Sequence, residues 1–243
     1  MQVLPHLWKD TFSELNDSVS TTKRSIRSFV RREGRITSAQ RQAVEQLWPQ
    51  FGLGKADLSD LDRVFGRRAP RFLEIGCGTG DAIISLAQSN PDNDYIGIEV
   101  YLPGLGSMLQ KIRACGLSNV RLLRDDAMEC LQDAILDHSF DGIMVFFPDP
   151  WPKKRHHKRR LIQPEFLSLV AKKLKRKGRL YLATDWQDYA DHILEITSDH
   201  PDLINLAGPA QYAPRPAWRP MTRFERRGLR LGHTVRDFLF VPR

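Results

Sequence analysis

The chain has 243 residues, 41% of them hydrophobic, which is enough to bury the core of one large α/β domain or of two small ones, and we expect one. No apolar run approaches roughly 18 residues, and residues 1–10 lack a signal-peptide core, so we expect a soluble, cytoplasmic protein rather than a membrane protein. Three scattered cysteines without CxxC spacing argue against a disulfide framework and against a zinc site.

The positive charge of the chain is concentrated in one region. The net charge is +8, from 37 lysines and arginines against 29 acids. Between residues 151 and 179, however, twelve lysines and arginines stand against a single acid, Glu165. A concentration of this kind indicates a localised anionic partner. Nucleic acid is the first candidate, and an acidic protein or a membrane surface is the second.

Residues 1–70 have the composition of an N-terminal extension, helical or partly disordered, in which Ser, Thr and charged residues are common. The extension contains a second basic cluster, formed by Lys23, Arg24, Arg27, Arg31, Arg32 and Arg35. Thr37 and Gln40 have capping-box spacing, and apolar residues follow at helical spacing up to Trp48, so we predict a short helix that ends before Pro49. Composition leaves open whether the basic arm is solvated and disordered or is ordered by RNA.

From residue 71 onward, strand-like and helix-like segments alternate. We predict strands at residues 71–75, 95–100, 120–123, 142–147 and 179–184. We predict helices at residues 81–89, 106–114 and 127–136, and a further helix that begins at Pro164 and is closed by Gly178. The tail, residues 233–241, has the alternation of an edge strand. The pattern predicts a doubly wound, mostly parallel α/β sheet over residues 71–243.

A glycine-rich loop, residues 73–80, follows the first predicted strand and opens a helix, and it contains Gly76, Gly78 and Gly80. Glycines let the backbone approach a ligand closely. The spacing is GxGxG rather than the GxGxxG of dinucleotide-binding proteins, and an acid, Glu74, stands two positions before the first glycine. The loop resembles motif I of S-adenosylmethionine-dependent methyltransferases, whose cationic cofactor favours a nearby acid.

Two further acids follow the next two predicted strands. Glu99 ends the second strand, where a carboxylate accepts hydrogen bonds from ribose hydroxyls, and Asp126 follows the third, placed to meet an adenine amino group. Each alone is equally well explained as a helix-capping or solvated acid. Together with Glu74, however, they place acids at the ends of three successive strands, and ligands of such sheets bind at the carboxyl ends of the strands. We therefore predict a cofactor site there.

The fourth predicted strand runs into the corner Pro148-Asp149-Pro150-Trp151-Pro152. Three prolines restrict the backbone, so we expect Asp149 and Trp151 to stand on a stiff, extended loop. By strand count, Asp149 lies next to the first strand and faces the methyl group of the cofactor. The alternative is a turn aspartate in a Pro-Asp-Pro corner.

The eight residues from Lys153 to Arg160 contain six cations and two histidines. His156 and His157 have no third ligand in register, so we expect no metal site. A run of cations is commonly a solvated face, but its position directly after a candidate catalytic acid favours contact with nucleic acid.

Taken together, these motifs resemble the bacterial tRNA (guanine-N7)-methyltransferase family from about Arg24 onward. The resemblance rests on the glycine loop and on residues 27–35, 97–104, 146–160, 184–186 and 219–228. It implies a Rossmann-like methyltransferase fold with a seven-stranded sheet, and methyl transfer from S-adenosylmethionine to N7 of a guanine in the variable loop of tRNA. It also implies tRNA as the partner of a monomer or homodimer, with no metal and no membrane.

Carried over position by position, the resemblance implies three groups of site residues. The cofactor-binding group is Glu74, Gly76, Gly78, Gly80, Glu99, Asp126, Ala127 and Asp149, of which Asp149 is also the catalytic candidate. The substrate-binding group is Lys153, Asp185, Thr222, Arg223, Phe224 and Glu225. The RNA-contacting group is Arg155, His156, His157, Lys158, Arg159 and Arg160. The residues from 222 to 225 have an alternative interpretation, a polar loop capped by its own Thr and by an Arg-Glu pair.

Three other functions compete with this one. A methyltransferase acting on an exocyclic amine has an acidic-Pro-Pro-aromatic motif, but here Pro and the acid alternate. A non-catalytic RNA-binding protein is expected to lack the cofactor acids, which are present. A nicotinamide dehydrogenase is disfavoured by the glycine spacing and by the basic run.

Overall fold

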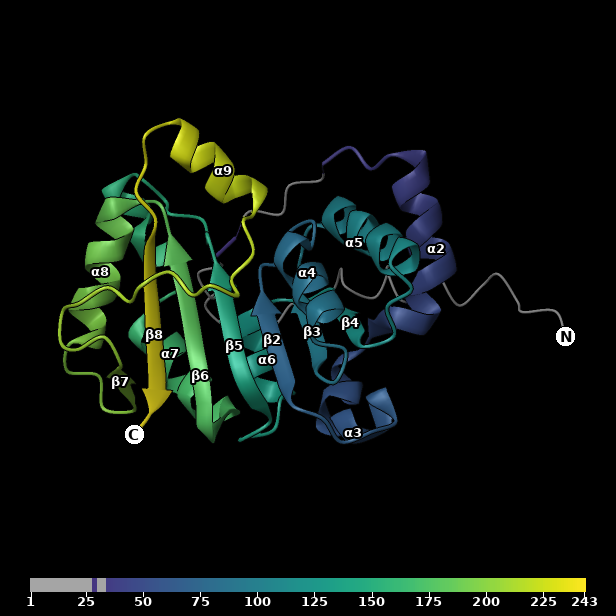
Figure 1. The fold of residues 1–243 in the computed structure, drawn as a ribbon, viewed down its shortest axis with the longest axis horizontal. Helices are drawn as coiled ribbons and strands as arrows, with labels where there is room; N and C mark the ends of the chain where they lie inside the picture. The colour runs from purple at the N-terminus through teal and green to yellow at the C-terminus, as the bar shows by residue number, and fades with distance from the viewer. Residues whose placement is uncertain (1–27, 30–33) are drawn as a thin grey trace, which may run out of the picture.

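The computed structural model describes residues 28–29 and 34–243, and its centre is an eight-stranded sheet with the order β1-β4-β3-β2-β5-β6-β8-β7 (Figure 1). The strands from β1 to β6 pair in parallel, and β8 is antiparallel to both β6 and β7. The predicted doubly wound, mostly parallel α/β sheet is therefore confirmed. The strands are β1 (Gly52–Leu53), β2 (Arg71–Ile75), β3 (Asp94–Ile98), β4 (Val120–Leu123), β5 (Phe140–Phe146), β6 (Leu174–Thr184), β7 (Leu203–Asn205) and β8 (Arg236–Pro242).

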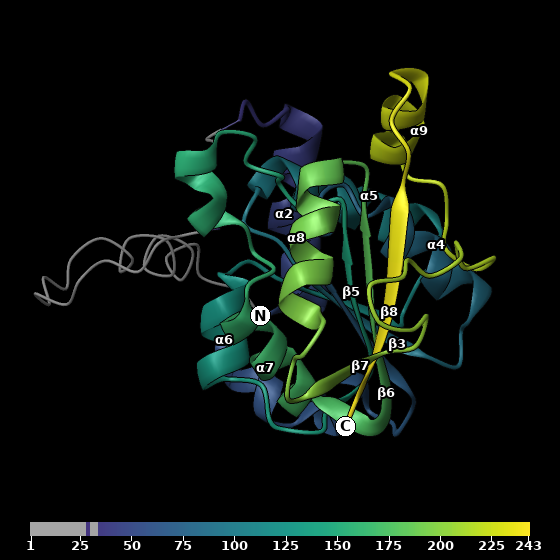
Figure 2. The same cartoon turned by 90° about the vertical axis from the view of Figure 1, so that its left-hand side faces the viewer.

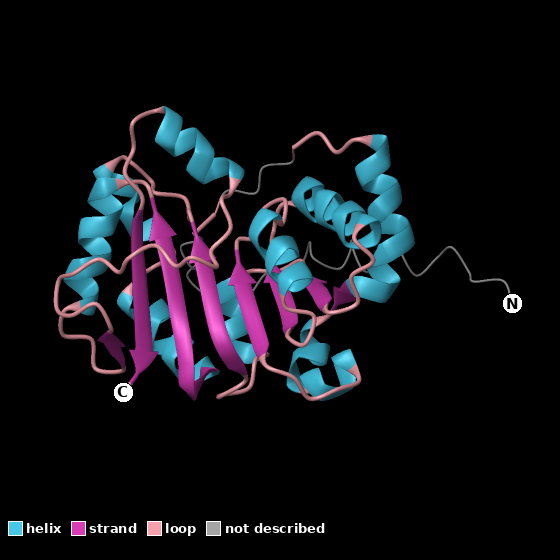
Figure 3. Cartoon of the chain, in the orientation of Figure 1, coloured by secondary structure: helices cyan, strands magenta, loops and turns pink. Residues whose placement is uncertain are grey.

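Helices cover both faces of the sheet (Figures 2 and 3). They are α2 (Ser38–Phe51), α3 (Leu61–Phe65), α4 (Asp81–Ser89), α5 (Leu102–Ala114), α6 (Ala127–Asp133), α7 (Pro164–Lys173), α8 (Gln187–Thr197) and α9 (Arg223–Arg230), with two 3₁₀ helices, η1 (Lys55–Ser59) and η2 (Lys154–Arg159). One core packs α2, α4 and α5 against the sheet, and the other packs α6, α7 and α8 against its opposite face. None of these helices combines the length and hydropathy needed to cross a bilayer.

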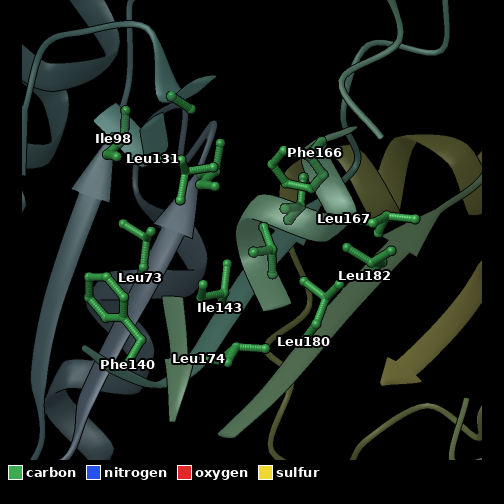
Figure 4. Close-up of a cluster of buried hydrophobic side chains, with 14 of the residues drawn as sticks. Leu73, Ile98, Leu131, Phe140, Ile143, Phe166, Leu167, Leu174, Leu180 and Leu182 are labelled. Atoms are coloured by element: carbon green, nitrogen blue, oxygen red, sulfur yellow. The ribbon is translucent and has the colours of Figure 1, made fainter. Parts of the chain in front are cut away.

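The central strands hold their places because successive side chains enter the two cores in turn. Ile143 of β5 lies in the core beneath α7, with Phe166 and Leu167 of that helix nearby (Figure 4), whereas the next residue, Met144, lies in the core beneath α4 and α5. Burying a side chain of this size fully contributes about 1.5–3 kcal/mol. The cores fix the strands, and the strands fix the loops at their carboxyl ends.

The sheet has one strand more than the seven that the resemblance implied, because the two-residue β1 pairs with β4. β1 belongs to the segment that the sequence assigns to an N-terminal extension. In the same segment, Leu58 and Leu61 are buried in the core beneath α6, and Gln40 Nε2 donates to Ser107 Oγ of α5 at 2.9 Å. The described part of the extension therefore packs against the sheet domain, and the boundary at residue 70 stays a prediction. The basic cluster predicted at residues 23–35 lies almost wholly outside the described residues.

The helix α2 has the predicted capping box: Gln40 N donates to Thr37 Oγ1 at 3.2 Å, and Thr37 N donates to Gln40 Oε1 at 2.9 Å. The prediction that this helix ends before Pro49 is wrong, because α2 continues to Phe51. Phe51 is buried in the core, and the Gly52 N–H closes the last turn on the Trp48 carbonyl. Packing thus retains a final turn that contains a proline.

The predicted end of the helix that begins at Pro164 is also wrong. The helix from Pro164 ends at Lys173, and Gly178 lies inside β6 rather than closing a helix. A Cβ at Gly178 would lie 2.9 Å from the Phe140 carbonyl oxygen, next to a register shift between β5 and β6, so close backbone approach explains this glycine.

The tail strand β8 is not an edge strand, because it lies between β6 and the three-residue β7. β7 is too short to give a pattern in the sequence. The other predicted elements are present, with boundaries shifted by up to five residues at the start of β6 (Leu174 against 179), and α3, α8, α9, β1, η1 and η2 were not predicted.

Candidate active site

A pocket of about 460 Å³ opens at the carboxyl ends of β2, β3 and β5. Its wall includes the glycine loop, the end of β3, Ala127, the corner after β5 and the start of α9, together with Ser28, Phe29 and Gly34 from the N-terminal part. β2 lies between β3 and β5, so the order of strands along the chain reverses at this point of the sheet. Open α/β sheets bind their ligands at such a point.

The glycine loop needs its glycines for two different reasons. Gly76 and Gly78 line the pocket with φ of +72° and +57°, a region that L side chains rarely adopt. Gly80 is absent from the pocket wall. Gly80 also has a positive φ, +77°, and a Cβ there would lie 2.1 Å from Met108 Cγ, so this glycine in addition allows α4 to pack against α5.

The Glu74 carboxylate is buried in the pocket wall, and its Oε2 atom has no hydrogen-bond partner among the described residues. Burial raises the pKa of Glu74 to about 8; a backbone contact with Ile83 opposes this rise, and the charges of Glu99 and Asp81 add to it. A buried oxygen without a partner calls for a ligand group that donates to it. A cationic donor would also restore the charged form of this acid.

The Glu99 carboxylate joins the end of β3 to the glycine loop. Its Oε2 accepts from Gly78 N at 2.7 Å, and its Oε1 accepts from Val100 N at 2.8 Å and Tyr101 N at 2.9 Å. Burial raises the pKa of Glu99, the three backbone donors oppose the rise, and the charge of Asp149 adds to it. The three bonds fix a carboxylate in the pocket wall, close enough to Asp149 for the two charges to interact.

The two acids that follow β4, Asp125 and Asp126, have different positions and contacts. Asp126 caps α6, because its Oδ1 accepts from Met128 N at 2.9 Å, so the helix-capping alternative is confirmed for this side chain. Asp125 and Ala127 line the pocket, whereas Asp126 does not. Sequence reasoning chose the second acid of the pair, and a role of Asp126 toward adenine stays a prediction.

The corner after β5 presents Asp149, exposed, in the pocket wall. Phe147 and Trp151 on either side have φ of 55° and 46°. The three prolines predicted an extended loop, but the loop is not extended at these two residues. Such a conformation costs a non-glycine residue about 1–3 kcal/mol and persists only where its surroundings hold it. Here Phe147 N donates to the Ala183 carbonyl at 2.8 Å, and Trp151 Nε1 donates to the Ser28 carbonyl at 3.1 Å.

Arg160 differs most from its prediction, because the last cation of the basic run is buried, with 2% of its surface exposed. Its Nε donates to the Pro150 carbonyl at 2.9 Å, its Nη2 bonds to the Asp188 carboxylate, and its guanidinium lies 4.8 Å from the centre of the Tyr189 ring. The Arg160 guanidinium is therefore occupied by contacts within the protein. Arg160 therefore fastens the Asp149 corner to α8 and has no surface to offer RNA.

The rest of the basic run forms η2 and the residue before it. The side chains of Lys153, Arg155 and Lys158 are exposed, and His156, His157 and Arg159 are partly buried. The Arg159 guanidinium lies 4.2 Å from the centre of the Trp151 ring. Burial and the surrounding cations lower the pKa of His156. None of these residues lines the pocket, but η2 continues directly from its rim.

The start of α9 gives the pocket three of its wall residues: Thr222, Arg223 and Phe224. Thr222 is the N-cap, and its Oγ1 accepts from Glu225 N at 3.2 Å. Glu225 itself is buried outside the pocket wall. Its carboxylate accepts bonds from Arg219 at 2.7 and 2.9 Å and from Arg215 at 3.1 Å. The alternative interpretation, a capped segment with an Arg-Glu pair, therefore describes Glu225.

Asp185 also lies outside the pocket wall, at the end of β6, where its Oδ2 is 3.0 Å from His233 Nδ1. No group of three or more His, Cys, Asp or Glu side chains suited to a metal occurs among residues 28–29 and 34–243.

Sequence reasoning missed Asp81 and Lys111. Lys111 Nζ donates to the Thr79 carbonyl at 2.8 Å and to Asp81 Oδ1 at 2.6 Å, and Asp81 Oδ2 accepts from Arg223 N at 3.4 Å. Burial acts to raise the pKa of Asp81, but Lys111 outweighs it, and the pKa is lowered. Asp81 thus connects the glycine loop with α5 and α9. The position of Asp81 directly after Gly80 was the one signal of this role in the sequence. Its partners Lys111 and Arg223 lie 30 and 142 residues away in the chain, where no local pattern records them.

Comparison with known proteins shows which family shares this sequence. A family model described as a putative methyltransferase matches residues 68–238. The tRNA (guanine-N(7)-)-methyltransferase of Alkalilimnicola ehrlichii is 53% identical over 233 residues, 95% of this chain and 98% of that protein. The chain belongs to the tRNA (guanine-N7)-methyltransferase family. A second family member, from Alcanivorax borkumensis, is 51% identical over 221 residues, 90% of this chain and 92% of its own. The resemblance read from the motifs is therefore confirmed.

Solved structures support the fold. An antibiotic-related methyltransferase superposes with a TM-score of 0.52 at 23% identity, covering 79% of this chain and 94% of its own. The aminoglycoside resistance methyltransferase NpmB1 gives the same TM-score and coverage at 17% identity. At these identities the likeness concerns the fold alone, and it agrees with the predicted methyltransferase fold.

Proposed function

We propose that this chain transfers a methyl group from S-adenosylmethionine to N7 of a guanine in the variable loop of tRNA. One observation carries the proposal: Glu74, Glu99 and Asp149 share a single pocket at the switch point of the sheet, and an exposed cationic segment begins at its rim. Relatives that share half or more of their residues with this chain are named for the same reaction.

The pocket fits the proposed cofactor. S-adenosylmethionine, when bound, supplies a methyl group carried on a cationic sulfonium. Glu74, with its unpartnered Oε2, is the acceptor we assign to the ammonium group of the amino-acid tail. Glu99 receives the ribose hydroxyls, Gly76 and Gly78 let the backbone approach, and Asp125 and Ala127 of the pocket wall face the adenine, with Asp126 between them in the chain.

Methylation at N7 does not require the protein to remove a proton from the reacting nitrogen. N7 of guanine has an in-plane lone pair and no proton, so positioning and electrostatics suffice without an obligatory general base. Asp149 accepts hydrogen bonds from the N1 and amino hydrogens of guanine, which selects the base and stabilises the positive charge that the ring acquires. Thr222, Arg223 and Phe224 hold the nucleotide from the other side of the pocket.

The remaining site residues act around this centre. Lys153 and Asp185 lie outside the pocket wall and contact the nucleotides that flank the guanine. Glu225 acts through Arg219 as a positioning residue for α9. The cations and histidines from Arg155 to Arg159 contact RNA phosphates. Arg160 is left out of this group because it is buried.

The proposal extends to the setting of the reaction. We assign the chain to the cytoplasm, where it acts as a monomer or a homodimer, and sedimentation at several concentrations distinguishes these two states. Residues 71–243 form the methyltransferase domain, and residues 1–70 act as an extension that contributes to RNA binding.

The decisive experiment is transfer of a labelled methyl group to bulk unmodified tRNA, followed by identification of the labelled nucleoside. We expect 7-methylguanosine. An N6-methyl or N4-methyl base would favour an exocyclic-amine methyltransferase instead. Absence of transfer, together with no binding of S-adenosylmethionine in calorimetry, would favour a non-catalytic RNA-binding protein.

A further inference from the structure

The helix α9 carries four arginines on one face. Arg223, Arg226, Arg227 and Arg230 are spaced i, i+3, i+4 and i+7, which places their side chains on one side of a helix. The buried residues of α9, Glu225 and Gly228, follow the buried N-cap Thr222 at intervals of three and lie on the opposite side. The arginine face therefore points away from the protein.

The attachment of α9 is narrow but firm. Glu225 is anchored on the buried Arg219, which also bonds to Asp237 of β8. At Gly228 the helix approaches the end of β6 so closely that a Cβ would lie 2.4 Å from Asp185 Oδ2. The His233 N–H then donates to the Gly228 carbonyl at 3.0 Å. The orientation of the arginine face is thus set by the fold.

The described residues offer this face no ion pair, and only Arg223 has an acid, Asp81, near enough for the two charges to interact. Within the part of the chain that the structure describes, none of the four arginines forms an ion pair, and the single acid of α9, Glu225, is paired with Arg215 and Arg219. Like charges three and four residues apart on a helix repel one another. An anionic ligand would remove this repulsion.

The position of α9 relates its charge to the pocket. Arg223 and Phe224 line the pocket, and Arg223 N donates to Asp81 at the start of α4. On the other face of the sheet, η2 is held to α8 because Arg160 Nη1 donates to the Asp188 carbonyl at 3.4 Å. Figure 2 shows α9 above the end of β8, with α8 on one side of the sheet and α4 on the other. The pocket mouth therefore lies between two cationic elements.

We propose that Arg226, Arg227 and Arg230 bind the phosphate backbone of the substrate RNA, across the pocket mouth from η2. This inference rests on the proposed function. Two cationic surfaces on opposite sides of the mouth hold the strand before and after the guanine, and so fix how that base enters the pocket. An anionic membrane is disfavoured because Phe224 belongs to the pocket wall, and the exposed Leu229 and Leu231 are two positions apart and form no common apolar face.

The test compares two variants with the same loss of charge. The double variant Arg227→Gln with Arg230→Gln alters the arginine face but leaves Arg226, whose Nη1 donates to the Met221 carbonyl. The control, Arg176→Gln with Lys177→Gln, removes two exposed cations from the amino-terminal part of β6, at the end of the strand opposite the pocket. Both are measured for affinity to unmodified tRNA over a range of salt, for S-adenosylmethionine binding by calorimetry, and for thermal unfolding.

We expect the α9 variant to lose roughly tenfold in tRNA affinity at low salt. Its slope of log K against log salt should become shallower by about 1.4–1.8, since each lost phosphate contact removes about 0.7–0.9. Cofactor affinity and melting temperature should stay at wild-type values, and the control should bind tRNA like the wild type.

A wild-type salt slope in the α9 variant, or an equal loss in the control, would overturn the inference. So would binding to vesicles of phosphatidylserine that tRNA does not compete away. If the wild-type protein itself does not bind tRNA, the proposed function fails, and this result is distinct from a wild type that binds while the α9 variant binds equally well.

Discussion

Arg160 Nε donates to the carbonyl oxygen of Pro150 at 2.9 Å, one residue beyond the catalytic candidate Asp149. The same guanidinium bonds to Asp188 and packs over the Tyr189 ring, both on α8. The corner that carries Asp149 is therefore held from behind by a cation of the basic run. Three prolines restrict this corner, and Arg160 decides where it lies.

Substitution Arg160→Gln should accordingly act on stability and turnover rather than on RNA affinity. Loss of the charged hydrogen bonds should lower the free energy of unfolding by about 2 kcal/mol, because Asp188 is half-exposed and recovers water. Denaturant unfolding, kcat and the Kd for tRNA measure the three effects. Arg155→Gln, at an exposed cation of η2, is the control and should change only affinity. A stable Arg160→Gln protein with weak RNA binding would instead support a direct RNA contact.

Substitution Asp149→Asn should reduce kcat about 100-fold or more, because it removes a charge aimed at a base that becomes cationic. Affinity for tRNA should change little, since the phosphate contacts lie elsewhere. Single-turnover methyl transfer and a separate binding titration give the two numbers. The pKa of Glu99 should also fall, because the Asp149 charge contributes to its elevation. Unchanged turnover would reject the assigned role.

Glu74 makes cofactor binding and stability depend on pH in opposite ways. Its pKa is about 8 in the folded protein against 4.5 as the ordinary value, so the folded state holds one more proton between these limits. Stability should therefore fall by up to about 1.4 kcal/mol per pH unit as the pH rises through this window. A cationic ligand requires the charged carboxylate, so its affinity should rise over the same window.

The variant Glu74→Gln separates these two effects. It should unfold with a flatter pH dependence and greater stability at pH 8, and it should bind S-adenosylmethionine at least tenfold more weakly at that pH, as one lost charged hydrogen bond implies. Thermal unfolding and calorimetry at pH 6 and pH 8 provide the comparison. Equal cofactor affinity in both proteins at pH 8 would remove Glu74 from the cofactor site.

Glu225→Gln tests the anchor of α9. Breaking a fully buried ion pair costs about 3–5 kcal/mol, and Arg219 and Glu225 side chains are 1% and 2% exposed. We expect a large loss of stability together with reduced turnover, because α9 carries Phe224 into the pocket wall. Arg227→Gln on the exposed face is the stability control. A stable Glu225→Gln protein that lacks turnover would indicate that Glu225 contacts the substrate directly.

The amino-acid sequence by itself determined the features that depend on neighbouring residues. The apolar strands, the glycine loop, the capping box at Thr37 and the acids after successive strands are patterns with short periods, and the physics behind them acts over a few residues. The family was likewise readable from such motifs. These patterns placed Glu74, Glu99 and Asp149 in one site, since parallel strands bring their carboxyl ends to a common edge.

Only the tertiary structure decided which charges face the pocket and which hold it together. Asp125 lines the pocket while Asp126 caps a helix, and Arg160 and Glu225 are buried. Arg160 is covered by a helix that begins 27 residues later in the chain, and β8 is made internal by a three-residue strand. The solvation of a charge depends on every group packed around it, and those groups come from distant parts of the chain, where no local spacing records them.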